Sequence, residues 1–155
     1  MNLVDELHAV AAALESEGIP YAVCGGVAVT IYGATRTTKD IDLLVRRQDM
    51  ARILDLLRPL GFAFAALPMT FDAGTERERE VQRVTKIDGD HHLVVDLMLD
   101  EAALAGFLAD RLVIDLPQGP LHVVSRETLL RMKRMAGRAQ DLADLERLEA
   151  NDGDS

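Results

Sequence analysis

Several features that would assign a chain to a common class of protein are scarce in this sequence. Among its 155 residues there is one cysteine, Cys24, which excludes an internal disulfide and any metal site made of several cysteines. No run of about eighteen apolar residues occurs, so we expect no membrane-spanning helix. The opening residues, MNLVDELHAV, are acidic where a secretory signal peptide is basic. Together these absences favour a cytoplasmic protein.

Positive charge is also scarce. The chain has 17 lysines and arginines against 26 aspartates and glutamates, for a net charge of -9. Such a protein repels a phosphate backbone at long range, which excludes broad coating of nucleic acid but leaves room for a local basic patch. Hydrophobic residues make up 48% of the sequence, enough for the core of one domain. We predict a single domain over residues 1–150 and a frayed tail over residues 151–155.

Hydrophobic periodicity divides the first part of the chain into alternating helices and strands. Apolar residues at helical spacing predict helices, and short apolar runs that end at glycine predict strands. The predicted helices cover residues 3–17, 27–32 and 49–57, and the predicted strands cover residues 21–24, 41–45 and 62–66. Residues 67–80 contain Pro68, Gly74 and alternating charges, which predicts a loop.

The second part of the chain predicts a hairpin, two more strands and a helix. Residues 81–87 and 93–99 flank Asp88-Gly89, a pair typical of tight hairpins, although the following Asp90-His91 indicates a longer loop. Short strands are predicted at 112–114 and 121–124. Ser125 is the predicted N-cap of a long C-terminal helix with a weak point at Gly137. The whole order predicts an α/β (α+β) fold in which a mixed, twisted sheet is flanked by helices.

Asp40 and Asp42 lie two residues apart in a predicted strand. Period-two geometry places both carboxylates on one face, with Cα atoms about 6.5 Å apart, while Ile41 points into the core. Two such carboxylates repel each other unless a cation lies between them. Pairs of Mg²⁺ ions about 3.5–4 Å apart fill that role in phosphoryl and nucleotidyl transfer. In an aspartate-rich chain, an exposed pair without a ligand is the alternative.

Asp96 lies inside the apolar segment LVVDLML. An unpaired carboxylate would cost several kcal/mol if it were buried there. Alternation places Val94, Asp96 and Met98 on one face. If this strand lies beside the Asp40 strand at about 4.8 Å, Asp96 supplies a third carboxylate. The alternative is an aspartate that binds a backbone amide or an arginine.

Two further features indicate an anion site. Gly25-Gly26 follows a strand and begins a helix, a turn that lets backbone amides approach a phosphate, although a tight turn without a ligand has the same pattern. Neither GxxxxGK[ST] nor GxGxxG occurs, which excludes a P-loop and a dinucleotide-binding motif. Lys133 lies among arginines on the C-terminal helix and could neutralise a triphosphate, or it could be an ordinary surface lysine.

These residues together resemble the nucleotidyltransferase superfamily, which has the DNA polymerase β-like fold. The resemblance covers about residues 21–148 and is carried by Gly25-Gly26, Gly33, Arg36, Thr38, Asp40-x-Asp42 and Asp96. The spacing R-x-T-x-D-x-D and the segment LLRMKRMAGRAQDLADLERL are similar to minimal bacterial nucleotidyltransferases related to the AbiEii toxins. Many members have a serine where this chain has Gly26. An Arg-Asp pair of tRNA-CCA-adding relatives is replaced in the region of Thr30-Ile31, which argues against that activity.

The resemblance implies metal-dependent transfer of a nucleoside monophosphate from an NTP to an acceptor hydroxyl. It implies that Asp40, Asp42 and Asp96 hold Mg²⁺ or Mn²⁺ and that Asp96 activates the hydroxyl. The nucleotide-binding residues that it implies are Gly25, Gly26, Arg36, Thr38 and Lys133. The acceptor is left open among RNA such as tRNA, a protein and a small molecule. The resemblance also raises a toxin–antitoxin role with a cognate partner protein.

Other functions remain open from the sequence. The short, acidic chain could be an inactive interaction module that retains the fold, such as an antitoxin-like subunit. A metal-dependent phosphohydrolase is a third alternative, but its histidine-rich motifs are missing. Asp141 and Asp144 favour a structural role, with Arg138, Arg147 or Arg36 as ion-pair partners. Cys24 in its apolar strand favours core packing over catalysis.

Overall fold

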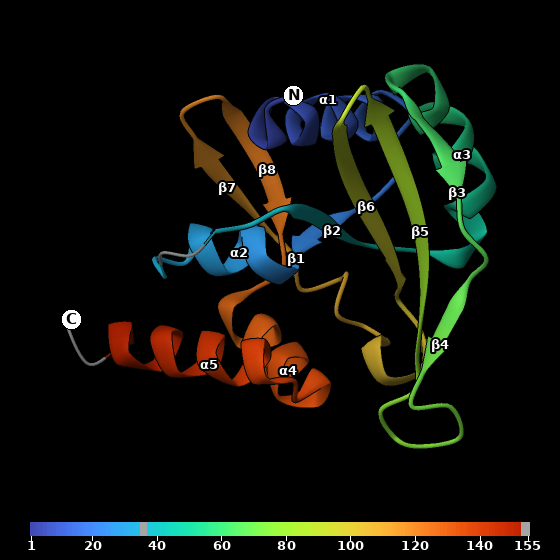
Figure 1. Ribbon diagram of the computed structural model, residues 1–155. Coiled ribbons are helices and arrows are strands. Elements are labelled where there is room, and N and C mark those ends of the chain that lie inside the picture. The colour runs from blue at the N-terminus through green and yellow to red at the C-terminus, as the bar shows by residue number, and fades with distance from the viewer. Residues whose placement is uncertain (35–36, 153–155) are drawn as a thin grey trace.

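The computed structural model describes residues 1–34 and 37–152, and within them a mixed sheet of eight strands forms the centre of the protein (Figure 1). The strands are β1 (Ala22–Cys24), β2 (Asp40–Val45), β3 (Phe62–Ala65), β4 (Met69–Phe71), β5 (Arg79–Asp88), β6 (His91–Leu99), β7 (Leu112–Leu116) and β8 (Gly119–Val123). The helices are α1 (Leu3–Ser16), α2 (Gly25–Ile31), α3 (Met50–Leu57), α4 (Arg126–Ala136) and α5 (Ala139–Asp152). Short 3-10 helices cover η1 (Arg47–Asp49), η2 (Arg58–Leu60) and η3 (Ala102–Leu104). The predicted mixed α/β architecture is confirmed.

The strand order is β3-β5-β6-β2-β1-β8-β7, and β4 pairs with β5 outside this path. The central pair, β2 and β6, is parallel, whereas β1 is antiparallel to β2 and β5 is antiparallel to β6. The parallel pair joins segments about fifty residues apart in the chain, with Asp40 opposite Val94 and Val45 opposite Leu99. The two predicted aspartate strands are therefore direct neighbours.

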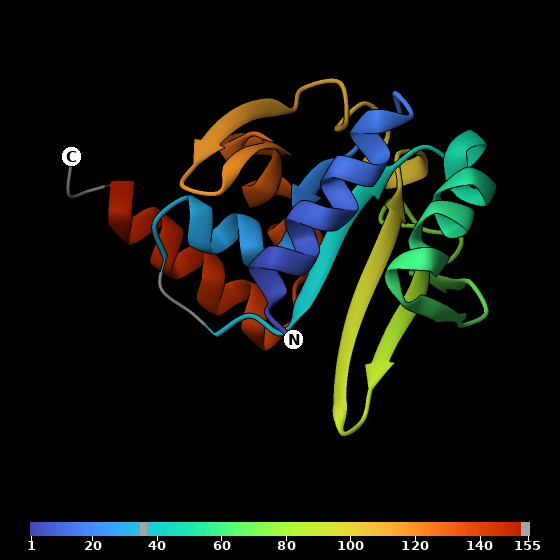
Figure 2. The same ribbon diagram turned by 90° about the horizontal axis from the view of Figure 1, so that it is seen from above.

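The sheet packs between two groups of helices. In Figure 1, β1 and β2 run between α1 above and the α4–α5 pair below, and α3 covers the β3 side of the sheet. Figure 2 shows α1 and α3 lying alongside the sheet from above, with α5 beyond α2. The core follows from strand alternation, because Ile41, Leu43, Val95 and Leu97 are fully buried on one face. The other face of β2 and β6 carries three aspartates among apolar residues: Asp40, Asp42 and Asp96 with Leu44, Val94 and Met98.

One short strand was not predicted. Met69–Phe71, placed in a loop by the sequence, forms β4 and pairs with the start of β5, with Met69 opposite Val81. Three residues are too few to show a period-two pattern, and only the partner strand stabilises them. Residues 72–78, the part of the predicted loop between β4 and β5, do form a loop, which lies at the bottom of Figure 1.

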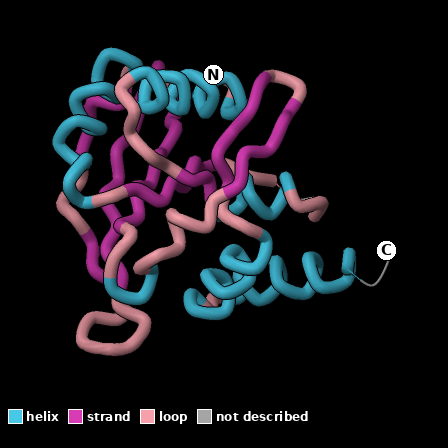
Figure 3. Tube along the Cα trace, turned by 180° about the vertical axis from the view of Figure 1, so that it is seen from behind, coloured by secondary structure: helices cyan, strands magenta, loops and turns pink. Residues whose placement is uncertain are grey.

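Two turns also differ from expectation. The β5–β6 hairpin closes through Gly89 and Asp90 alone, so the longer loop is wrong; Gly89 takes a left-handed φ of 61°. Ser125 caps α4 as predicted, accepting a hydrogen bond from the Thr128 amide at 3.1 Å. The single long helix after it is divided, because Gly137 takes a φ of 62° and ends α4. The chain then turns back, and α5 packs against α4, as seen from behind in Figure 3.

Two remaining predictions concern residues that the structure describes only in part or not at all. Arg36 lies outside the described residues. The expected frayed tail lies partly outside them as well, since α5 continues to Asp152 and the structure describes nothing of residues 153–155. Within the described ranges, none of the helices combines the length and the apolar character needed to cross a bilayer.

Candidate active site

The site is built on the register between β2 and β6, in which Asp42 and Asp96 lie directly opposite each other. Parallel neighbours are about 4.8 Å apart, so the two carboxylates share one face at close range. Asp40 lies two residues earlier on the same face, opposite Val94. The alternation predicted for both strands is confirmed, since Ile41 is buried on the opposite face.

Gly25 leaves the space that the Asp42 carboxylate occupies. It lies at the junction of β1 and α2 with a φ of 63°, next to Cys24, whose Cα pairs with that of Asp42. A Cβ atom built on Gly25 would overlap Oδ2 of Asp42 and lie 2.7 Å from its Cγ. Both the backbone conformation and the close approach therefore require glycine. The structure explains Gly25 by this contact, whereas Gly26 is buried and forms part of the wall of a cavity.

The charge of Asp42 is poorly balanced. Burial, and after it the negative charges of Asp96 and Asp40, together raise the pKa of its carboxyl from 3.8 to about 7, against the opposing charges of Lys133 and Arg138. Among the described residues, none donates a hydrogen bond to this carboxylate. A nearby cation would therefore favour the ionised form.

Arg83 is a site residue that the sequence did not reveal. It lies on β5 directly opposite Asp96, and its Nε and Nη2 donate hydrogen bonds of 2.8 and 3.0 Å to the two carboxylate oxygens. This outcome matches the alternative in which Asp96 binds an arginine. The register of the hairpin could have identified Arg83 from the sequence. A two-residue turn after Asp88 places Arg83 opposite Asp96, whereas the longer loop that we predicted leaves this pairing undefined.

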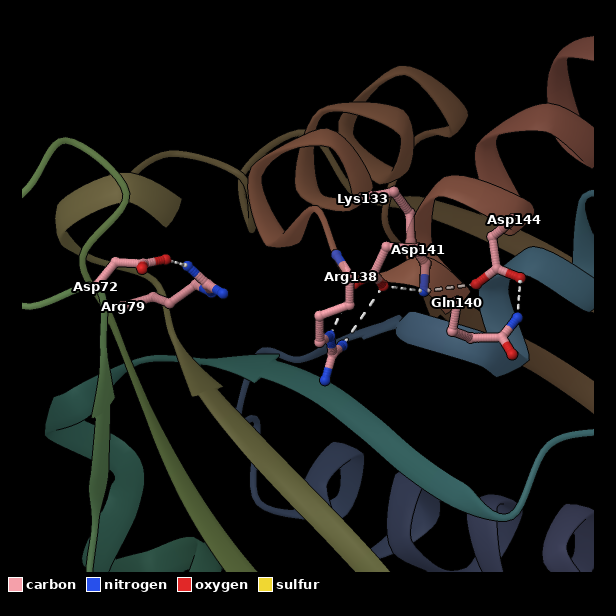
Figure 4. A network of polar contacts seen from close by, with 7 residues as sticks. All are labelled: Asp72, Arg79, Lys133, Arg138, Gln140, Asp141 and Asp144. Carbon is pink, nitrogen blue, oxygen red and sulfur yellow. Dashed lines mark hydrogen bonds and ion pairs between the residues drawn. The ribbon is translucent and has the colours of Figure 1, made fainter.

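The α4–α5 pair brings a buried ion network to the same face (Figure 4). Lys133 is 7% exposed, and its Nζ lies 3.2 Å from Oδ1 of Asp141 and 2.9 Å from Oδ2 of Asp144. Arg138 Nε donates a 2.7 Å hydrogen bond to Asp141, and Gln140 donates one of 3.0 Å to Asp144. Arg138, one of the predicted partners, thus pairs with Asp141, whereas Lys133, which was not among the predicted partners, pairs with both aspartates.

Electrostatics in this network favour the ionised aspartate. Burial opposes the charge of Asp141, but the hydrogen bond from Arg138 and the charge of Lys133 outweigh it and lower the pKa of that carboxyl. Lys133 is accordingly a buried cation with two partners, and the surface-lysine interpretation is wrong. Its contact with a triphosphate remains a prediction.

Two cavities meet at these residues. The first, of about 440 Å³, is polar, and its wall includes Gly26, Thr38, Lys39 and Asp40. The Oγ1 atom of Thr38 is buried there without a hydrogen-bond partner among the described residues. The second, of about 350 Å³, extends toward β4 and η3, where its wall is formed by apolar side chains, and we call it the apolar cavity. Their shared wall is formed by Asp42, Arg83, Asp96, Lys133, Arg138 and Asp141.

The carboxylates have the right chemistry for a divalent cation. Oxygen donors suit Mg²⁺ and Mn²⁺, and the pKa of Asp42 is raised by burial and then by neighbouring negative charges, both of which a cation would offset. In the part of the chain that the structure describes, however, no group of three or more His, Cys, Asp or Glu side chains is arranged to hold a metal ion. Arg83 occupies both oxygens of Asp96 instead. Of the three carboxylates, those of Asp40 and Asp42 are outside this ion pair, and they fit a divalent cation by the chemistry of their oxygens.

A family model and solved structures both relate this chain to nucleotidyltransferases. A family model described as "Uncharacterised nucleotidyltransferase" matches residues 1–137, from α1 to the end of α4. A candidate nucleotidyltransferase from Thermotoga maritima has a similar crystal structure, with a TM-score of 0.64, 15% identity, and coverage of 96% of this chain and 92% of that one. The enzyme ANT(2″)-Ia, solved with adenylyl-2″-tobramycin, gives a TM-score of 0.59 at 14% identity, covering 96% and 88%. Among curated proteins, none matches significantly. At these identities the solved structures show the shared fold alone.

Proposed function

The chain belongs to the family described as uncharacterised nucleotidyltransferases, and we propose that it transfers a nucleoside monophosphate from an NTP to an acceptor hydroxyl in a reaction that depends on Mg²⁺ or Mn²⁺. The observation that carries this proposal is the in-register pair of Asp42 and Asp96 beside two cavities of ligand size. A half-buried carboxylate with a pKa near 7 and no bonded partner among the described residues is expected at a ligand site rather than in a structural ion pair.

Asp40 and Asp42 would hold the cation, with Asp96 completing the site once Arg83 releases it. When bound, the cation would supply positive charge to the triphosphate and to the developing transition state. Asp96 would accept the proton of the acceptor hydroxyl, whose oxygen then bonds to the α-phosphorus as the bond to pyrophosphate breaks. The proton ends on a carboxylate oxygen of Asp96, from which the Arg83 guanidinium must first withdraw.

The polar cavity would bind the nucleotide. Gly26 and the unpartnered Thr38 hydroxyl lie in its wall, together with Lys133. We propose that Lys133 acts with its aspartate partners in place, contributing charge from a fixed position rather than as a free side chain. Gly25 contributes by leaving room for Asp42, and the proposed role of Arg36 rests on the sequence resemblance.

An inactive interaction module is the second candidate. The observation that favours it is the bidentate Arg83–Asp96 pair, which leaves that carboxylate without a free oxygen. A toxin–antitoxin role with a cognate partner, and a cytoplasmic location, are proposals supported only by the resemblance to AbiEii-type proteins and by composition. The acceptor remains one of three classes: RNA, protein or a small molecule.

The experiment that tests the proposal measures label transfer and NTP binding together. Purified protein is incubated with each [α-³²P]NTP, Mg²⁺ and, in turn, bulk tRNA, lysate protein and small alcohols. Asp42→Asn is expected to abolish transfer, and Asp115→Asn, at an exposed position of β7, to leave it unchanged. Absence of both transfer and metal-dependent NTP binding in the wild type would favour the interaction module.

A further inference from the structure

We propose that the apolar cavity beside Asp96 receives the acceptor, and that the acceptor is an uncharged alcohol with a largely apolar body. This inference rests on the proposed nucleotidyl transfer, because the cavity is called an acceptor site only if an NTP occupies its polar neighbour. It makes a narrower claim, since it selects one chemical class among the acceptors left open above.

The composition of the two walls assigns different ligands to the two cavities. The apolar cavity is lined by side chains from β4, β6, η3 and α4, among them Met69, Phe71, Met98, Leu104, Met132 and Ala136. The polar cavity has hydroxyl, amide and lysine groups in place of these. Phosphates and a ribose need the polar groups, whereas the cluster of methionine, phenylalanine and leucine side chains in the other wall favours a hydrophobic body.

Asp96, the proposed acceptor of the hydroxyl proton, lies in the wall of the apolar cavity. Met98 lies two residues beyond Asp96 on the same face of β6, so the apolar wall begins next to that carboxylate. A hydroxyl within reach of Asp96 would therefore carry its body into the cavity. Because methionine side chains are flexible and polarisable, the three in this wall can adapt to different apolar shapes.

Charge in the apolar cavity is balanced, which determines the class of acceptor. Its wall contains four carboxylates and four cationic side chains, and three of the carboxylates are already paired. Arg79 donates a 2.7 Å hydrogen bond to Asp72, Arg83 binds Asp96, and Lys133 and Arg138 bind Asp141. Figure 4 shows the Asp72–Arg79 pair on one side and the Asp141 network on the other. A polycation or polyanion would compete with the Asp72–Arg79 pair and with the Asp141 network, whereas an uncharged ligand leaves both intact. Only the Arg83–Asp96 pair has to open for the proposed transfer.

The volume of the apolar cavity also favours a small acceptor. A cavity of about 350 Å³ holds a compact small molecule and cannot enclose a folded RNA or protein body. The acceptor predicted by volume, charge and wall chemistry is thus a small, uncharged alcohol.

The first test uses the methionines as reporters, without requiring turnover. The chain has 6 methionines, and three of them line the apolar cavity: Met69, Met98 and Met132. Protein labelled with ¹³C at the methionine methyl groups is titrated with 4-phenyl-1-butanol as an uncharged probe, with tobramycin as a polycation and with Mg²⁺-ATP. We expect the alcohol to shift these three signals saturably while those of Met1 and Met50 stay in place. Absence of a shift, or an equal shift with tobramycin, would overturn the proposal.

A cavity-filling variant makes the assignment specific. Ala136→Phe adds a ring to the apolar wall only, and Met69→Trp does so from β4, so one is available should the other fail to fold. Each is expected to weaken alcohol binding by about tenfold or more while NTP affinity stays within about twofold. Ala12→Phe, on the exposed face of α1, is the matched control. Loss of NTP binding in both filling variants would show that the cavity holds the nucleobase instead.

The last step separates this proposal from the broader one. With [α-³²P]ATP, label is expected on 4-phenyl-1-butanol and at least about tenfold less on tobramycin. Label on tobramycin or tRNA with none on the alcohol would overturn the acceptor class and leave nucleotidyl transfer standing. Alcohol binding without metal-dependent NTP binding would instead overturn the proposed function, and the acceptor assignment with it.

Discussion

Arg83 and Asp96 face each other across the β5–β6 hairpin, and the guanidinium of one forms two hydrogen bonds with the carboxylate of the other. The pair is half-open to solvent on the arginine side, where the side chain is 43% exposed, against 13% for the aspartate. Asp96 is therefore held by an arginine that can move away. A cation that needs Asp96 must compete with Arg83.

Replacing Arg83 is expected to strengthen cation binding. In Arg83→Gln the competing guanidinium is gone, and since an exposed charged pair is worth about 1 kcal/mol, the affinity for Mn²⁺ should rise about fivefold. Titration followed by electron paramagnetic resonance measures it. Arg58→Gln, which breaks an exposed pair with Asp55, is the control. An unchanged Mn²⁺ affinity would show that Asp96 takes no part in holding the cation.

Asp42 makes the stability of the fold depend on pH. Its pKa is raised from 3.8 to about 7 in the folded protein, so the folded state binds the proton more tightly than the unfolded state. The contribution of Asp42 to the free energy of unfolding should be largest below about pH 4, fall as the pH rises to 7, and then level off, with a total loss of at most about 4 kcal/mol. Asp42→Asn should remove the fall and stabilise the protein by about 2–4 kcal/mol at pH 8, with little effect at pH 4.

Urea unfolding at pH 4, 6 and 8 measures this dependence. Asp115→Asn, at an exposed position, serves as the control and should reproduce the wild-type pH profile. If wild type and Asp42→Asn show parallel profiles, Asp42 has an ordinary pKa and a carboxylate with uncompensated charge at this position is excluded.

Gly25→Ala and Gly18→Ala form a matched pair of variants. Both glycines have a left-handed φ, 63° and 66°, so each alanine costs about 1 kcal/mol of backbone strain. Only at Gly25 does the added Cβ overlap the Asp42 carboxylate, whereas nothing lies within 4 Å at Gly18. We expect Gly25→Ala to lose nucleotide transfer about a hundredfold more than Gly18→Ala, because the Asp42 carboxylate is displaced. Equal transfer rates in the two variants would contradict the packing role of Gly25.

Lys133 is expected to contribute strongly to stability. Lys133→Met removes the buried cation shared by Asp141 and Asp144 and should cost about 3–5 kcal/mol in the free energy of unfolding. Arg134→Met removes the neighbouring exposed pair with Glu149 and should cost less than about 1 kcal/mol. Thermal and urea unfolding compare the two. A small loss in Lys133→Met would mean that the network is not formed in solution.

Much of the fold follows from local pattern. Strand alternation around Asp42 and Asp96, the cap at Ser125 and the break at Gly137 each depend on residues close together in the chain, and sequence spacing reports them. The short strand β4 was not predicted, because its pairing with β5, rather than its own composition, stabilises it. The length of the β5–β6 turn was not predicted correctly either, because Asp88-Gly89-Asp90 is compatible with more than one hairpin.

The sequence by itself determined that two strands carry carboxylates on one face, because side-chain direction along a strand has a period of two. Only the tertiary structure decided what those carboxylates meet. The parallel pairing of β2 with β6 sets Asp42 opposite Asp96, the hairpin brings Arg83 to Asp96, and the turn at Gly137 folds α5 back onto Lys133. Each contact joins residues far apart in the chain or depends on a turn of undetermined length, and periodicity carries no information about such distances.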